Sequence, residues 1–173
     1  MAINNRVWRG LKELSLWALV LLLGLWLGGW ARGLMMSAPL AGVPAVTLPQ
    51  LAQPDHNPTP LLQSQTQLLY LFAPWCHICK VTFPQLQSWQ QQGFRVTPVA
   101  LDYQSIGEIS EFVGQFEPAP TGVLVGDRVL QQQLGLVAFP TYLIVDGSGT
   151  VLSKRVGYMP EWALSLYLRY YGV

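Results

Sequence analysis

Apolar and polar residues alternate in regular patterns over the second half of the chain. Leu68–Phe72 is an apolar run of strand length, and after Ala73-Pro74 the apolar side chains of residues 79–90 recur every three to four positions, which predicts a strand followed by a helix. The other predicted elements are, in order, a strand at Phe94–Leu101, a helix at Ser105–Phe116, a strand at Thr121–Val125, a helix at Asp127–Leu134, strands at Tyr142–Val145 and Val151–Val156, and a final helix that begins near Pro160.

Two short features refine this pattern. Pro98 lies inside the second predicted strand and removes a hydrogen-bond donor from it, which predicts an edge strand or a bulge. The turn signal Asp146-Gly147-Ser148-Gly149 separates the last two strands and predicts a hairpin. Strands that alternate with helices and end in a hairpin and a closing helix are typical of an α/β sandwich.

The amino-terminal part follows a different pattern. No charged residue occurs between Leu14 and Ala31, and at about 1.5 Å per residue this stretch is roughly 27 Å long, close to the ~30 Å core of a bilayer. We therefore predict a transmembrane anchor at residues 14–34. Three basic residues precede the stretch and one follows closely, so residues 1–13 are expected in the cytoplasm.

Two alternatives to this anchor stay open. A cleaved signal peptide would need a small-x-small cleavage site, and Met35–Pro39 is a poor one. A buried globular helix would be polar on one side, whereas this stretch is apolar on every face.

Residues 35–60 are rich in proline and predict a tether. Extended, polyproline-like backbone over Ser37–Pro60 would reach roughly 70 Å at ~3.1 Å per residue. Alternatively, its segment Ala45–Leu51 lies along the domain as an edge strand. The globular domain is then expected at residues 61–173.

Composition changes this picture in two ways. Hydrophobic residues make up 51% of the chain and charged residues only 11%, which agrees with a part of the chain lying in a membrane. The formal net charge of +1 gives no electrostatic basis for binding nucleic acid. Both cysteines fall in the motif Cys76-His77-Ile78-Cys79, so none is left for a disulfide framework or for the second half of a zinc site.

The two cysteines occupy different places on the predicted helix. Cys79 falls on the apolar stripe that faces a core, whereas Cys76 lies one turn earlier, where free backbone N–H groups and the helix dipole favour negative charge. A thiol at that position loses its proton more readily, and the thiolate is the reactive form. The spacing predicts an exposed nucleophilic sulfur with a shielded second sulfur beside it, as in a dithiol/disulfide redox pair. A structural disulfide or half of a metal site is the alternative reading of the motif.

Three separate motifs resemble the thioredoxin fold. Trp75–Lys80, with Pro84 after it, is similar to the active-site helix of that fold. Phe139-Pro140-Thr141 resembles its cis-proline loop, and Val156-Gly157 falls where those proteins commonly have a glycine before their last helix. The resemblance covers residues 61–173.

The extra helix and strand within Ser105–Gly126, together with the anchor, resemble the membrane-tethered thiol:disulfide oxidoreductases of the bacterial envelope. These include the TlpA and cytochrome c maturation type and, with the nearest resemblance, relatives linked to suppression of copper sensitivity. The resemblance implies a thioredoxin-like sandwich with this insertion before the cis-proline, preceded by one transmembrane helix. It further implies a single-pass protein of the inner membrane with its carboxyl-terminal domain in the periplasm. The implied partners are protein thiols and disulfides and a membrane redox partner that recycles the dithiol, with no nucleic acid, cofactor or metal.

The resemblance also assigns roles to site residues. Cys76 and Cys79 are implied as the catalytic residues and as a redox-active disulfide. The implied active-site environment consists of Trp75, His77, Ile78, Phe139 and Pro140, with Pro140 in cis. His77 either favours the thiolate when it is protonated or is only an exposed loop residue. Trp75 is interpreted as a packing lid rather than a chemical group.

Two positions depart from the family pattern. Many thioredoxins carry a buried acid six residues before the first cysteine, where this chain has Tyr70, and some envelope reductases carry a Glu six residues after it, where this chain has Thr82. Neither acid is present to accept the proton of Cys79, so a water, or His77 through water, is expected to do so. Two competing functions stay open: a Cu(I)-binding protein whose ligands are the two thiolates, and a structural module with an inert disulfide.

Overall fold

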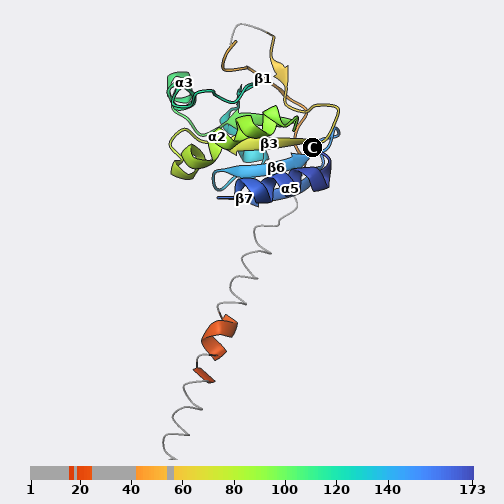
Figure 1. Cartoon of the computed structure of the whole chain (residues 1–173). Coiled ribbons are helices and arrows are strands. Elements are labelled where there is room, and N and C mark those ends of the chain that lie inside the picture. The colour runs from red at the N-terminus through yellow and green to blue at the C-terminus, as the bar shows by residue number, and fades with distance from the viewer. Residues whose placement is uncertain (1–15, 18, 25–41, 54–56) are drawn as a thin grey trace, which may run out of the picture. The chain divides into compact units, whose positions relative to one another are not determined.

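The computed structural model describes residues 16–17, 19–24, 42–53 and 57–173, which fall into two compact units that divide after Pro39 (Figure 1). In the first unit, residues 16–17 and 19–24 are helical. The predicted segment 1–13 and most of the predicted anchor at 14–34 lie outside the described residues. Among the residues that are described, no helix is both long enough and apolar enough to span a membrane.

The second unit is built on a five-stranded mixed sheet with the strand order β5-β4-β3-β6-β7. Its strands are β3 (Gln67–Phe72), β4 (Val96–Ala100), β5 (Leu124–Val125), β6 (Thr141–Val145) and β7 (Val151–Val156). The β3–β4 and β4–β5 pairs are parallel, and β6 pairs antiparallel with both β3 and β7. Every residue of β3, β4 and β6 is buried, because both faces of the sheet are covered.

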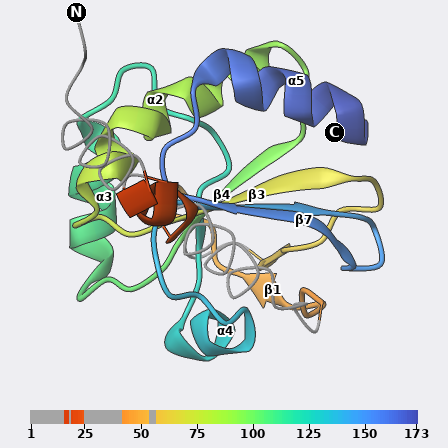
Figure 2. The ribbon, with the colours of Figure 1, turned by 90° about the horizontal axis from the view of Figure 1, so that it is seen from below.

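Helices cover the two faces unequally. Helices α2 (His77–Gln91), α3 (Ile106–Gly114) and α5 (Glu161–Tyr171) pack on the face that carries Tyr70 and Phe72. Helix α4 (Arg128–Gln133) packs on the opposite face, against Leu69 and Leu71. Val43, Leu48 and Leu61 of the segment before β3 pack on the same face. Figure 2 shows the sheet nearly edge-on, with α2 and α5 on one side and α4 and β1 on the other. The predicted α/β sandwich is confirmed.

The predicted insertion is present as α3 and β5, but the expectation for Pro98 is wrong. Strand β4 is an inner strand, and Pro98 stands in regular register opposite Tyr70 of β3 without a bulge. The proline is tolerated there because β5 is only two residues long and pairs with Val99 and Ala100, so Pro98 has no strand neighbour on that side.

The proline-rich segment packs on the domain from Val43 onward. Strand β1 (Thr47–Leu48) pairs antiparallel with β2 (Thr59–Pro60). The backbone then joins the free edge of β5, since Val125 N donates to Pro49 O and Leu51 N donates to Val123 O, both at 2.9 Å. Of the two alternatives for this segment, the edge-strand arrangement is therefore the one found.

Candidate functional site

The cysteine motif follows the carboxyl end of the central strand. Strand β3 ends at Phe72, and Cys76 N donates to Ala73 O at 3.0 Å, which closes a turn before α2 begins at His77. Cys76 is the N-cap residue of α2 in an extended conformation, and its sulfur accepts a hydrogen bond from Cys79 N at 3.2 Å. The chain thus places the sulfur of Cys76 where a helix leaves its first N–H groups unpaired.

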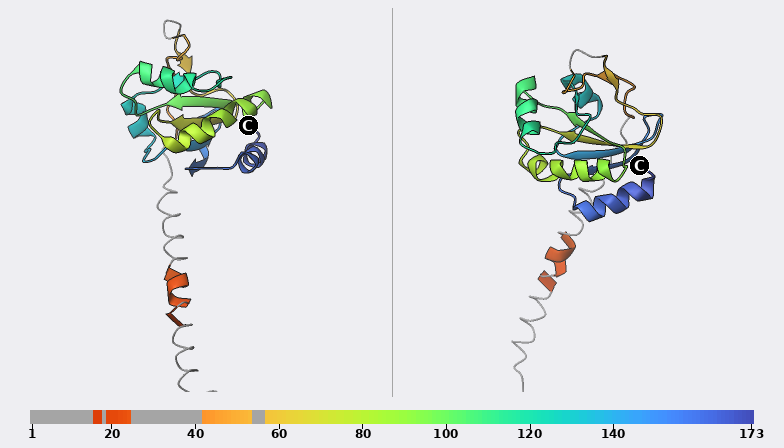
Figure 3. Two further views of the ribbon diagram at one scale, coloured as in Figure 1. Left: turned by 60° about the vertical axis from the view of Figure 1, so that its left-hand side comes forward. Right: turned by 45° about the horizontal axis from the view of Figure 1, so that its top comes forward.

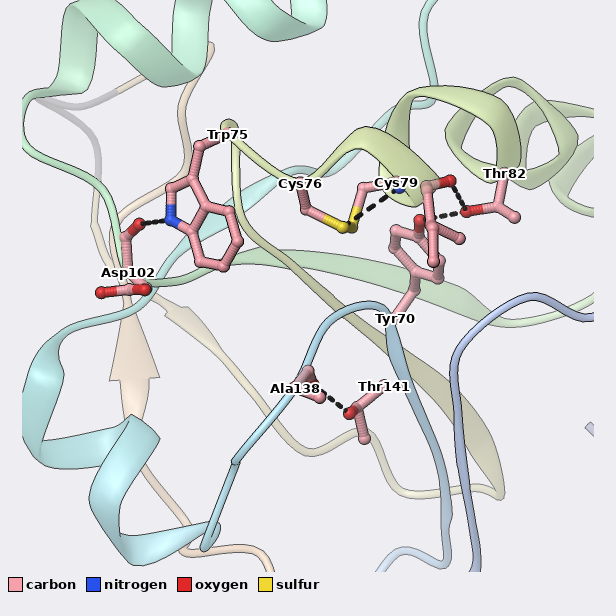
Figure 4. The surroundings of a disulfide bond; sticks show 9 residues. Tyr70, Trp75, Cys76, Cys79, Thr82, Asp102, Ala138 and Thr141 are labelled. Carbon is pink, nitrogen blue, oxygen red and sulfur yellow. Dashed lines mark hydrogen bonds between the residues drawn. A yellow bond between two sulfur atoms is a disulfide. The ribbon is translucent and has the colours of Figure 1, made fainter.

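The two cysteines form a disulfide, with their Cα atoms 5.2 Å apart. Both sulfurs turn beneath the first turn of α2, beside the ring of Tyr70 (Figure 4). Cys79 is fully buried and Cys76 is only 5% exposed, so the prediction of an exposed Cys76 is wrong for this oxidised form. The reason is that Cys76 takes part in the same hydrophobic cluster as Cys79, Phe72 and Ala73.

The start of α2 favours a thiolate at Cys76. Its N–H groups and dipole present partial positive charge to the sulfur, and its first turn carries no acidic residue. His77 and Ile78, which separate the cysteines, are both exposed at the helix start. They therefore border the pair from the solvent side and do not pack beneath it.

Trp75 and the proline loop meet beside the cysteines. The indole Nε1 of Trp75 donates to Asp102 O at 2.8 Å, and its ring packs edge-on against Phe139, with ring centroids 6.0 Å apart. The Phe139–Pro140 peptide bond is cis, as expected from the resemblance. Thr141 Oγ1 donates to Ala138 O at 2.7 Å and closes the loop below the disulfide (Figure 4).

The buried region beside the disulfide contains uncharged hydroxyl groups. Tyr70 and Thr82 are fully buried, and their hydroxyl oxygens lie 2.7 Å apart. Thr82 Oγ1 also donates to Ile78 O at 3.1 Å, so its single proton is used and Tyr70 is the donor to Thr82. Burial raises the pKa of Tyr70 far above its usual range. The two positions that lack an acid in the sequence are therefore joined by a hydrogen bond.

A third hydroxyl, that of Tyr142, belongs to the same region. The rings of Tyr70 and Tyr142 pack edge-on with centroids 5.3 Å apart. Within the described part of the chain, the buried Tyr142 hydroxyl has no hydrogen-bond partner. Burial raises the pKa of Tyr142 to about 12. Sequence reasoning missed Tyr142, although it follows the proline loop by two residues and pairs with Tyr70 across the sheet.

An open pocket of about 450 Å³ begins at Trp75. It is lined by Trp75, Asp102, Tyr103, Gln104, Gly126, Asp127, Arg128 and Gln131. Sequence reasoning missed Asp102, which takes a left-handed conformation with φ 51° that Asp tolerates better than most residues. Its signal was the parallel pairing of β3 and β4, whose carboxyl ends bring Asp102 and Trp75 to one edge of the sheet.

The cysteine sulfurs and the other potential metal ligands are arranged as follows. The two sulfurs are bonded to each other. Among the described residues, no three or more His, Cys, Asp or Glu side chains gather where they could hold a metal ion. The arrangement is instead suited to thiol–disulfide exchange, with one sulfur at a helix start and a second sulfur buried within bonding distance.

Comparisons of the sequence agree with this chemistry. No family model matches the chain. It is 28% identical over 149 residues to the thiol:disulfide interchange protein DsbE of Yersinia pestis, covering 80% of this chain and 78% of that protein. It is also 28% identical over 119 residues to the protein of the same name from Escherichia coli strain K12, covering 66% of this chain and 63% of that protein.

Solved structures show the fold. An exposed lipoprotein thioredoxin from Streptococcus pneumoniae matches 73% of this chain and 99% of its own with a TM-score of 0.61 and 18% identity. A secreted disulfide oxidoreductase from Mycobacterium tuberculosis matches 73% of this chain and 96% of its own with a TM-score of 0.56 and 18% identity. The fold, the bonded cysteine pair and the sequence relatives together make this chain a thioredoxin-like thiol:disulfide oxidoreductase, similar to the DsbE proteins.

Proposed function

We propose that this oxidoreductase works at the outer face of a bacterial inner membrane, where residues 14–34 anchor it, and exchanges disulfides with other proteins through Cys76. The position of Cys76 carries the proposal. Its sulfur caps α2 and is bonded to Cys79. The preceding residue, Trp75, lines an open pocket. The uncharged stretch from Leu14 to Ala31, preceded by basic residues, supports the anchor and its orientation.

The exchange takes two steps in the reducing direction. The Cys76 thiolate attacks one sulfur of a substrate disulfide, which breaks that bond, forms a mixed disulfide and releases one substrate thiolate. The Cys79 thiolate then attacks the Cys76 sulfur and releases the second substrate thiolate, which leaves the Cys76–Cys79 disulfide seen here. Two electrons pass to the substrate. A membrane-bound dithiol partner returns the pair to its reduced form by the same exchange, and the oxidising direction runs these steps in reverse.

The small opening at Cys76 restricts the form of a substrate. With 5% of its surface exposed, Cys76 does not meet a flat protein face, whereas an extended or loop segment reaches it more easily. The pocket beside Trp75 gives such a segment a place for a neighbouring side chain. Protein disulfides in flexible segments are therefore the proposed substrate class.

Trapping tests the substrate class. In full-length protein with Cys79→Ala, the mixed disulfide at Cys76 cannot be resolved, so reducible adducts with envelope proteins should accumulate and be identified by mass spectrometry. Cys76→Ala is the matched control and should trap none. Equal adduct formation by the two variants would contradict the assignment of Cys76 as the attacking sulfur.

Localisation is tested separately from exchange. The full chain should float with membranes in a density gradient and resist extraction by high salt. Protease added outside spheroplasts should digest the thioredoxin-like domain, while a cytoplasmic marker stays intact. Protection of the domain in intact spheroplasts would refute the proposed orientation, whatever the exchange activity.

A further inference from the structure

The closing helix α5 presents an apolar stripe on its outer side. Its inner residues Leu164 and Leu168 are fully buried against the sheet. On the opposite side, Trp162, Leu166 and Tyr170 are 71%, 63% and 81% exposed. These three residues recur every four positions and therefore form one stripe along the helix. A surface helix normally carries polar residues on that side.

Within residues 42–53 and 57–173 of the thioredoxin-like unit, no other element covers this stripe. Figure 2 shows α5 in one layer with α2 on the same side of the sheet, and both views of Figure 3 show α5 at the outside of the unit. Single exposed apolar residues need no explanation, but a contiguous row of three large ones indicates a contact surface.

The residues around the stripe are mainly basic. Arg169 lies on α5, and Arg155 of β7 donates from Nε to the hydroxyl of Tyr167 on α5 at 3.2 Å. Lys154, the residue before it, turns to the other face of the sheet, where its Nζ donates to Gly135 O at 3.5 Å. Against the two arginines, α5 holds one acidic residue, Glu161, which accepts a hydrogen bond from Ser88 Oγ at 2.9 Å. Trp, Tyr and Leu flanked by cations suit the boundary of an anionic bilayer, where aromatic rings and basic groups both find favourable surroundings.

The length of the chain before the domain also favours the bilayer as the surface that contacts this stripe. Val43 is buried, and its N–H donates to Gly149 O at 2.7 Å, so the chain already packs on the domain at this residue. Between residue 34 and Val43 the backbone spans at most about 30 Å, even when fully extended. If residues 14–34 lie in the membrane, the domain stays within that distance of it, and the bilayer is present at high effective concentration.

We propose that the outer stripe of α5, made of Trp162, Leu166 and Tyr170, rests on the anionic surface of the bilayer that anchors the chain. The inference depends on the anchoring proposed above. The contact has a consequence for the redox pair. Gly157 N donates to Pro140 O at 2.8 Å, so the chain segment that leads into α5 begins at the proline loop beside the cysteines. Seating α5 on the membrane keeps Cys76 near the bilayer surface, within reach of a membrane-embedded dithiol partner.

Quenching of tryptophan fluorescence by brominated lipid tests the contact. The full-length protein is reconstituted in vesicles of phosphatidylcholine and phosphatidylglycerol, with and without bromine near the head of the acyl chains. The signal of Trp162 is obtained as the difference between wild type and Trp162→Phe. We expect it to lose about half or more of its intensity, because interfacial helices bury their apolar side ~5–10 Å deep.

Trp75 supplies the matched control, since it is 59% exposed but lies at the cysteines. The difference between wild type and Trp75→Phe should lose much less intensity. A second pair of variants tests the stripe at a residue other than Trp162. Leu166→Glu should release the Trp162 signal from quenching, whereas Val129→Glu, on α4 and 58% exposed, should not.

The outcomes separate this inference from the anchor itself. If the protein floats with the vesicles but Trp162 is not quenched, the contact is refuted and the anchor stands. If the protein does not float, the proposed anchoring fails, and the contact fails with it. A Trp162 signal that depends on the number of protein molecules per vesicle and not on bromine would assign the stripe to a second copy of the chain and overturn the membrane contact.

Discussion

The two sides of the Cys76–Cys79 disulfide offer different chemistry. On its buried side, the side chains of Tyr70 and Thr82 are fully buried, and that of Tyr142 almost so, and their polar groups are all neutral hydroxyls. On the open side, Trp75 leads to a pocket lined by the carboxylates of Asp102 and Asp127 and by Arg128. Among the described side chains named here, charge therefore lies on the side that substrates approach and not on the buried side.

This difference bears on how each sulfur is controlled. The Cys76 sulfur receives the partial positive charge of the α2 start, which favours its thiolate. Cys79 lies on the side of the neutral hydroxyls, and burial raises the pKa values of Tyr70 and Tyr142, so neither phenol is ionised to serve as a base near neutral pH. The two sulfurs thus differ in surroundings more than in exposure, and the attacking and resolving roles follow from that difference.

The largest expected effect comes from removing each sulfur in turn. Cys76→Ser should abolish reduction of a model disulfide protein, because no thiolate remains at the helix start. Cys79→Ser should also stop turnover, but it should keep a single-turnover attack that leaves a mixed disulfide. Stopped-flow and quenched-flow assays on the reduced proteins distinguish the two. A burst of equal size in both variants would contradict the assignment of different roles.

The open side is tested by Trp75→Ala. Trp75 precedes Cys76 in the chain and lines the pocket, and truncation of such a contact typically costs ~2 kcal/mol, so kcat/KM for a disulfide peptide should fall roughly thirtyfold. Trp75→Phe keeps an aromatic ring but loses the hydrogen bond to Asp102 O, so its kcat/KM should lie between those of wild type and Trp75→Ala. Trp162→Ala is the control, since that exposed indole lies on α5, and it should leave reduction of a soluble peptide unchanged.

The parts of this site differ in how well the sequence predicts them. Strand β3, helix α2 and the proline loop are predictable because each depends on local features: an apolar run, the CxxC motif and Phe139-Pro140. The burial of Cys76 is not predictable in this way, since it depends on packing against residues of the cluster from other elements. The role of Asp102 depends on strand pairing, and that of Tyr142 on a neighbour 72 positions earlier, Tyr70, directly opposite on β3.

The same distinction explains why the sequence left two arrangements open for the proline-rich residues 35–60. The prolines of this segment exclude a helix, but they do not distinguish an extended tether from a strand along the domain. The choice is made by backbone groups elsewhere, namely Val123, Val125 and Gly149, which bond to this segment. At Gly149 a side chain would not fit, because a Cβ atom there would lie 2.5 Å from Val43 O. Such long-range pairing leaves no periodic pattern in the sequence.

The buried side is tested by Thr82→Val. The substitution keeps the shape of the side chain but leaves the Tyr70 hydroxyl without its acceptor, which should lower the free energy of unfolding by ~1–3 kcal/mol. Thr82→Val combined with Tyr70→Phe should cost less than Thr82→Val alone, because no buried donor is then left unpaired. Denaturant unfolding of the oxidised proteins measures both. Costs that simply add would show that the two hydroxyls do not interact.

The smallest expected effect concerns Tyr142. Its buried hydroxyl has no partner among the described residues, so Tyr142→Phe should leave stability at pH 7 unchanged or raise it by up to ~1 kcal/mol. The pH dependence is more informative. Burial raises the pKa of Tyr142 from 10.0 to about 12, so the folded state holds this proton more tightly than the unfolded chain does. The contribution of the neutral hydroxyl is therefore complete below pH 10 and is lost as the pH rises towards about 12. Unfolding midpoints measured from pH 9 to 12 should fall less steeply for Tyr142→Phe than for wild type. Parallel curves would mean that the Tyr142 hydroxyl is not buried in the folded protein.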